Sequence, residues 1–141
     1  MNRVAVQFLD QSFHRMLFDA MPVPVFVVDE DVRILECNAA AARLLGPDKQ
    51  TILKRRGGEV LHCVNAAKVP EGCGRAPACH DCPVRKAVQT ASRGQRVTRQ
   101  KARMELAAGG KTTRMDFQIS CSPFTYERSK FVLLVLEGLN G

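Results

Sequence analysis

The sequence predicts an α+β domain, in which one five-stranded antiparallel sheet carries helices on one face. Three observations lead to this fold class. The chain has 141 residues, of which 45% are hydrophobic and 25% charged, as in a single globular domain. Its periodic segments follow the order helix, two strands, helices, three strands. The last third alternates apolar and polar residues with period two, which is typical of antiparallel strands with one solvated face.

We expect residues 1–20 to form an N-terminal amphipathic helix. Apolar side chains recur at helical spacing between Val4 and Ala20. Pro22 ends this segment, because the residue before a proline is driven out of the helical region. The apolar face of such a helix could cover a sheet or pair with a second copy of the chain.

A β-hairpin and a short helix are predicted next. The runs Val25–Val28 and Val32–Cys37 are rich in β-branched residues and flank an acidic turn over residues 29–31. Asn38 is a favourable N-cap, and we expect it to begin a helix over Ala39–Leu45. The three acidic residues are interpreted as a turn and not as a catalytic carboxylate pair.

Residues 48–82 are irregular and too long for an ordinary loop in a compact domain. Something must organise this stretch, and we define a cysteine-rich segment over residues 57–83. A helix follows from Pro83, a favoured first helical residue, to Ser92. The remaining residues 21–141 are expected to form one domain around this segment.

Three strands complete the prediction. Period-two alternation marks strands over Gln95–Leu106 and Lys111–Ser122, joined by a turn at residues 107–110. We expect a loop over Pro123–Lys130. The run Phe131–Leu136 is apolar at every position, which is typical of a central strand covered on both faces.

Four of the six cysteines lie within twenty residues, in the pattern C-x9-C-x5-C-x2-C: Cys63, Cys73, Cys79 and Cys82. In a reducing compartment such a group indicates metal or redox chemistry more often than disulfides. Four thiolates can hold one tetrahedral metal ion or one iron–sulfur cluster. The glycines beside Cys73 leave its backbone free to bend, and the start of the Pro83 helix should lower the thiol pKa of Cys82.

The identity of the group that these thiols hold stays open. An iron–sulfur cluster is the first choice, because its ligand spacings are irregular and a proline follows the last cysteine. Zinc comes second, since only Cys79 and Cys82 form a short knuckle. A metal-free thiol–disulfide switch, or reduced thiols with no sensing role, are the further alternatives. His62 and His80 flank cysteines and are possible additional ligands.

The stretches FDAMPVPVFVVDEDVRILECNAAAARLLG and RMDFQISCSPFTYERSKFVLLVLEG resemble a PAS domain. The middle, GEVLHCVNAAKVPEGCGRAPACHDCPVRKAV, is similar to a cysteine-bearing insertion of some bacterial sensory PAS domains. The resemblance implies a PAS-like fold and a sensory, dimerising module that signals to a histidine kinase or another output protein. It also implies that the N-terminal helix mediates a homodimer.

Charge and motifs bear on the remaining function classes. The net charge of +7 permits contact with nucleic acid, but no nucleic-acid-binding motif accompanies it, so that partner is not favoured. No catalytic signature is present, and we do not expect an enzyme. The sequence has no apolar run of membrane-spanning length and no secretory leader, which favours a cytoplasmic protein.

Overall fold

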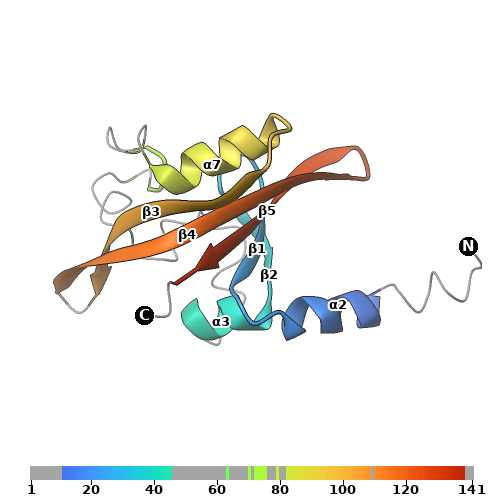
Figure 1. The fold of residues 1–141 in the computed structure, drawn as a ribbon, viewed down its shortest axis with the longest axis horizontal. Helices are drawn as coiled ribbons and strands as arrows, with labels where there is room; N and C mark the ends of the chain where they lie inside the picture. The colour runs from blue at the N-terminus through green and yellow to red at the C-terminus, as the bar shows by residue number, and fades with distance from the viewer. Residues whose placement is uncertain are drawn as a thin grey trace, which may run out of the picture.

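Five strands form one antiparallel sheet with the order β2-β1-β5-β4-β3 (Figure 1). The computed structural model describes residues 11–45, 63, 70, 72–75, 79, 82–108 and 110–138. Its elements are α2 (Gln11–Ala20), β1 (Val25–Val28), β2 (Ile34–Cys37), α3 (Ala39–Leu45), α7 (Pro83–Ser92), β3 (Val97–Ala108), β4 (Lys111–Tyr126) and β5 (Ser129–Glu137). The predicted fold class is confirmed.

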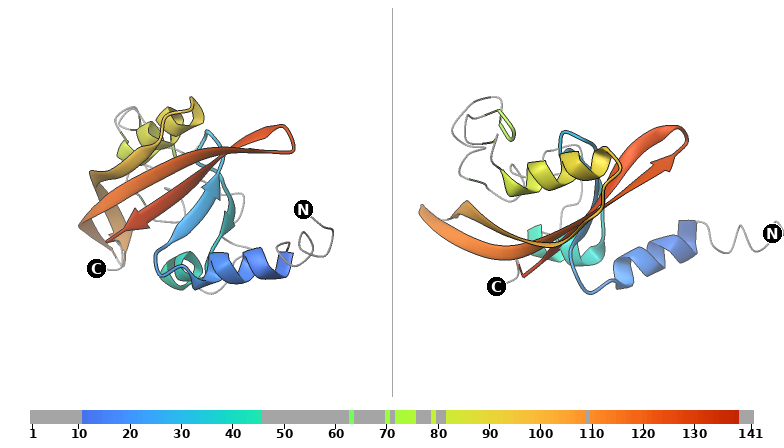
Figure 2. Two further views of the ribbon diagram at one scale, coloured as in Figure 1. Left: turned by 45° about the vertical axis from the view of Figure 1, so that its right-hand side comes forward. Right: turned by 45° about the horizontal axis from the view of Figure 1, so that its top comes forward.

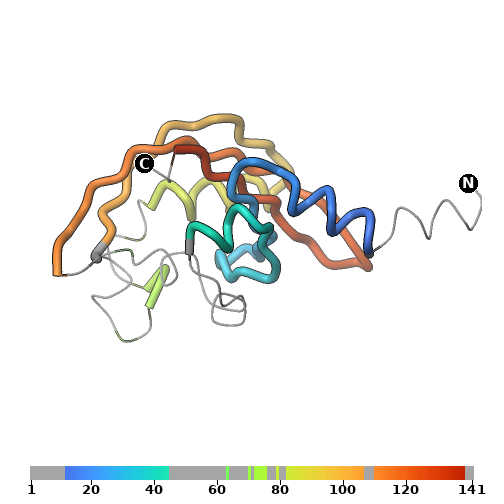
Figure 3. Tube along the Cα trace, turned by 90° about the horizontal axis from the view of Figure 1, so that it is seen from below, coloured from blue at the N-terminus to red at the C-terminus, as the bar shows by residue number. Residues whose placement is uncertain are grey.

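The helices α3 and α7 both lie on the concave side of the curved sheet (Figure 3). α7 packs across β3, β4 and β5, and α3 packs against β1. The contacting side of α7 consists of small and β-branched residues, which let the helix approach the strands closely: Val84, Ala87, Val88 and Ala91. The sheet contributes large side chains to the same core, among them Phe26, Ile119, Leu134 and Leu136.

The helices predicted over Ala39–Leu45 and from Pro83 to Ser92 are confirmed with these bounds as α3 and α7. Asn38 is buried, and its side-chain Oδ1 accepts hydrogen bonds from the backbone N–H groups of Val25 and Ala41. Its Nδ2 donates to the carbonyl of Val23. Asn38 therefore caps α3 and also joins the start of α3 to the start of β1.

The N-terminal helix α2 is fixed to the domain by charged groups at its middle and near its C-terminal end. Arg15 pairs with Asp19 and Glu36 and donates to the carbonyl of Cys37. Asp19 Oδ1 accepts the backbone N–H of Ala39, the first residue of α3. Residues 1–10 of the predicted helix lie outside the described part of the chain.

The predicted loop over Pro123–Lys130 is wrong. β4 and β5 pair continuously up to Tyr126 and Ser129, and their hairpin extends beyond the rest of the sheet (Figure 2). The turn is confined to Glu127 and Arg128, both of which have positive φ angles. The rings of Phe124 and Phe131 lie 5.5 Å apart across the two strands and stabilise this extension.

β5 is the central strand, as predicted, but its two faces differ in burial. Val132, Leu134 and Leu136 are buried against the helices, whereas Phe131, Leu133 and Val135 on the other face are only half-buried. Within the described residues, no helix is long and apolar enough to span a bilayer.

Candidate functional site

The four clustered cysteines are anchored by different parts of the fold. Cys63 forms an isolated antiparallel bridge with Leu106 of β3 and packs against the core. Cys82 immediately precedes α7, as its N-cap, and also packs against the core. Cys73 and Cys79 lie in the intervening segment and are buried, with 9% and 6% of their surfaces exposed.

These anchors place the other cysteines near Cys82. The backbone N–H of Cys82 donates to the carbonyl of Cys79 at 3.2 Å, which closes a turn between the last two cysteines. Cys63 and Cys73 are near enough to Cys82 for their charges to act on its thiol. Cys82, at the N-terminal end of α7, is therefore the cysteine that the described contacts connect to the other three.

The pKa of Cys82 differs from the expectation. Burial raises the pKa of its thiol, and the charges of Cys63 and Cys73 add to that effect. Backbone N–H groups of Arg85 and Val84 lower the pKa, as the start of a helix should, but they do not outweigh burial. The predicted lowering is therefore wrong for the chain without a bound group.

Cys37 and Cys121 lie outside the cysteine-rich segment and belong to the hydrophobic core. Both are fully buried in the core, and burial raises the pKa of Cys121 to about 12. Cys121 behaves as a small apolar side chain of the sheet.

Arg85 of α7 makes a polar contact with the described part of the cysteine-rich segment. Its side chain, 11% exposed, pairs with Asp31 through Nη1 at 2.9 Å. Nη2 lies 3.2 Å from the carbonyl oxygen of Asp31 and 4.0 Å from Cys73 Sγ. Arg75 approaches the other carboxylate oxygen of Asp31 at 2.9 Å.

The sequence interpretation assigned Asp31 only a turn. A signal for Arg85 does exist in the sequence, since it lies three residues before Val88, at the border of the buried side of α7. For Asp31 we find no such signal, because 54 residues separate it from its partner.

Two features of Arg85 concern its fit to a bound group. Among the described residues its Nε is buried and has no hydrogen-bond partner. A side chain at Gly74, where φ is +85°, would collide with the guanidinium. Arg85 therefore places a largely buried cation beside Cys73, where it would offset part of the negative charge of a thiolate–metal centre.

The positions of the cysteines support a bound metal less well than their chemistry does. Over the described ranges, no three Cys, His, Asp or Glu side chains converge closely enough to hold a metal ion. His62 and His80 lie outside those ranges. Thiol type, burial and counter-charge fit a soft metal or an iron–sulfur cluster, but the sulfurs do not form a closed ligand shell.

The comparisons with known proteins agree with the fold. Residues 12–78 match the sequence profile described as PAS domain. Among curated proteins, none matches the chain. Solved structures similar to it include the PAS domain of an HTR-like protein from Haloarcula marismortui, at 21% identity and a TM-score of 0.55, covering 89% of this chain and 94% of that one.

Two further similar structures are the PAS domains of a nitrogen regulation protein and of a sensor histidine kinase. That of nitrogen regulation protein NR(II) from Vibrio parahaemolyticus is 13% identical, with a TM-score of 0.57 and coverage of 91% and 99%. That of a two-component sensor histidine kinase is 10% identical, with a TM-score of 0.57 and coverage of 96% and 98%. Residues 12–78 therefore carry a PAS domain profile, and the five-stranded chain shares the fold of these solved PAS domains.

Proposed function

We propose that this PAS domain is a bacterial signal-transduction sensor in which Cys63, Cys73, Cys79 and Cys82 respond to redox state, oxygen or a metal ion. One observation supports the proposal: separately anchored segments bring Cys63 and Cys73 within electrostatic reach of Cys82 at the N-terminal end of α7, with Cys79 one turn before Cys82. Because α7 packs over three strands, a change at its first turn acts directly on the core.

An iron–sulfur cluster is our first choice for the bound group, and zinc is the second. A cluster would supply a centre that electrons or oxygen can change, whereas zinc would supply a redox-inert ligand shell. In either case the four cysteines would be the protein's ligands, and Arg85 would offset part of their negative charge. A metal-free thiol–disulfide switch is the third form of this proposal.

We further propose that the signal leaves the domain by protein–protein contact and not by catalysis. α2 presents Met16 and Leu17, 71% and 50% exposed, as an apolar surface suited to a homodimer. A histidine kinase is the favoured output partner, since PAS domains of this fold occur in such proteins. A cytoplasmic location suits the free thiols, because a reducing compartment keeps them reduced.

Purification without oxygen, followed by metal and acid-labile sulfide analysis, tests the proposed centre. We expect iron, sulfide and visible absorbance that bleaches in air, and we expect Cys82→Ser to lose all three. Cys121→Ala is the matched control, because it removes a cysteine outside the cluster and should retain them.

The other outcomes separate the alternatives. Colourless protein with stoichiometric zinc would exclude the cluster and favour a structural zinc site in an interaction module. In that case redox state should not alter partner binding. Metal-free protein that forms a cysteine-segment disulfide on mild oxidation would favour the thiol switch. Metal-free protein that oxidants leave unchanged would overturn the proposal.

A further inference from the structure

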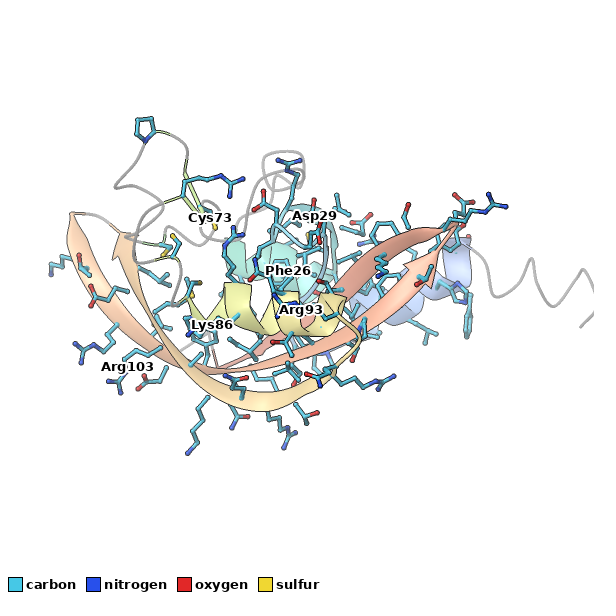
Figure 4. All side chains as sticks on the ribbon, turned by 90° about the horizontal axis from the view of Figure 1, so that it is seen from above. Phe26, Asp29, Cys73, Lys86, Arg93 and Arg103 are labelled. Atoms are coloured by element: carbon cyan, nitrogen blue, oxygen red, sulfur yellow. The ribbon has the colours of Figure 1, made fainter. Side chains whose placement is uncertain are left out.

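Arg85 joins the cysteine-rich segment to a turn that lies far away in the sequence. Its guanidinium contacts Asp31 through both a carboxylate oxygen and a backbone carbonyl oxygen. The same Nη2 that faces this carbonyl also faces Cys73 Sγ. In Figure 4, Cys73 lies above α7 on the side where Asp29 of the β1–β2 turn also lies.

The charges in this group make Arg85 sensitive to the state of the sulfur. Asp31 pairs with both Arg75 and Arg85, so two cations meet one carboxylate. Nη1 of Arg85 lies 2.9 Å from Asp31 Oδ1 and Nη2 lies 4.0 Å from Cys73 Sγ, so the guanidinium has a carboxylate and a sulfur as neighbours. Because a guanidinium stays protonated in proteins, a change in the charge of the sulfur acts on it directly.

The backbone of Gly74 closes one side of the guanidinium, since a Cβ atom at this position would overlap Nη2. The β1–β2 turn is also tightly ordered, since Asp29 Oδ1 accepts the backbone N–H groups of Asp31 and Arg33. Val32 has a φ of +61°, and its N–H donates to the carbonyl of Asp29. A displaced guanidinium would therefore disturb an otherwise well-bonded turn.

We infer that Arg85 is the coupling residue through which the chemical state of Cys73 reaches the β1–β2 turn. The contacts on both sides of one guanidinium carry this inference. It rests on the proposed sensing role of the cysteines for its biological meaning. The coupling itself is a property of Cys73, Arg85 and Asp31, and it can be measured in reduced, metal-free protein.

A double-mutant cycle on the full chain tests the coupling, with amide hydrogen exchange of residues 29–33 as the readout. We expect Cys73→Ser and Arg85→Gln each to speed exchange in this turn about threefold or more. In the double variant, Cys73→Ser should add nothing further, because its route to the turn has been removed. Equal acceleration by Cys73→Ser with and without Arg85 would overturn the inference.

Matched controls isolate the contact from general loosening of the segment. Cys79→Ser removes another buried thiol of the segment, and we expect no change in the turn. Arg75→Gln removes the more exposed partner of Asp31 and should leave the effect of Cys73→Ser intact. Arg85→Lys keeps the positive charge but lacks the two terminal guanidinium nitrogens that face Asp31 and Cys73. If Arg85→Gln does not fold, the same cycle in Arg85→Lys should reduce the effect of Cys73→Ser by at least about half.

The double-mutant cycle does not depend on the identity of any bound group. If anaerobic protein contains no metal and resists oxidation, the proposed function is overturned. The cycle still measures whether Cys73 and the β1–β2 turn are coupled through Arg85. If the cycle is additive, the coupling fails while metal or redox chemistry at the cysteines stays open to its own test.

Discussion

The sheet–helix core and the cysteine-rich segment are held in place by different forces. The core joins α7 to the sheet through side chains with little or no exposed surface, such as Phe26, Val88 and Ile119. Two cysteines of the segment also pack against this core, but its described part is attached in addition by a β-bridge at Cys63 and by the ion pair of Arg75 with Asp31. Hydrophobic burial is non-directional and hard to switch, whereas ion pairs depend on the charge of each partner. We therefore expect the core to set the fold and the segment to respond to chemistry.

Truncation of the core should have the largest effect. Phe26 is 2% exposed and faces the helices from β1. Phe26→Ala should lower the free energy of unfolding by about 3–5 kcal/mol, because it removes buried apolar surface and leaves a cavity. Urea denaturation followed by circular dichroism measures this loss. Leu35→Ala on the neighbouring strand is the control, since Leu35 is exposed and its loss should be small. Equal losses would contradict the proposed division between core and surface.

Substitutions at two glycines should have effects of intermediate size, and they compare the cysteine-rich segment with the β3–β4 turn. Gly74 and Gly110 have φ angles of +85° and +79°, but only Gly74 has a neighbour in the way of a Cβ atom. Both alanine variants should share the same backbone cost of about 1–2 kcal/mol. Gly74→Ala should cost about 1–3 kcal/mol more, because it displaces Arg85 from Asp31. Urea denaturation of the two variants measures the difference, and equal losses would show that Arg85 adapts freely.

The smallest effect is expected at the exposed pair Arg103–Asp116, whose Nε and Oδ1 atoms lie 2.6 Å apart. The hydrogen bond from Arg103 lowers the pKa of Asp116 below its ordinary value of 3.8. A carboxylate with a lowered pKa stabilises the folded state above pH 3.8 and loses that contribution as the pH falls through its folded value. The difference in melting temperature between the wild type and Asp116→Asn should be slight at pH 6 and should close in acid or high salt. A difference that grows in acid would contradict this assignment.

Local sequence signals predicted the regular elements well because those elements depend on local physics. The capping of α3 by Asn38 and the start of α7 at Pro83 are short-range effects, and both are confirmed. The hairpin between β4 and β5 was predicted too short. Its Pro123 and charged tip favour a loop, but pairing across the strands and the Phe124–Phe131 contact outweigh that preference.

Less of the candidate site than of the fold could be predicted from the sequence. Spacing identified the four cysteines as a group, and the ligand role of that group stays a prediction. The contact between Asp31 and Arg85 could not be predicted, because no periodicity connects a turn with a helix 54 residues later. The pKa of Cys82 was predicted in the wrong direction, since the helix start is visible in the sequence but the burial of the thiol is not.

The attachment of α2 couples its orientation to α3 and β2 together. Asp19 accepts the first backbone N–H of α3, and Arg15, at the middle of α2, is tied to Glu36 and to the carbonyl of Cys37 in β2. The residues from Arg15 back to Gln11 extend about 6 Å from this attachment. A tilt of α2 by about 10° would therefore displace Gln11 by only about 1 Å over that length. A movement of β2 or of the start of α3 is instead passed on to the exposed apolar side chains of Met16 and Leu17, which lie between the two attachment points.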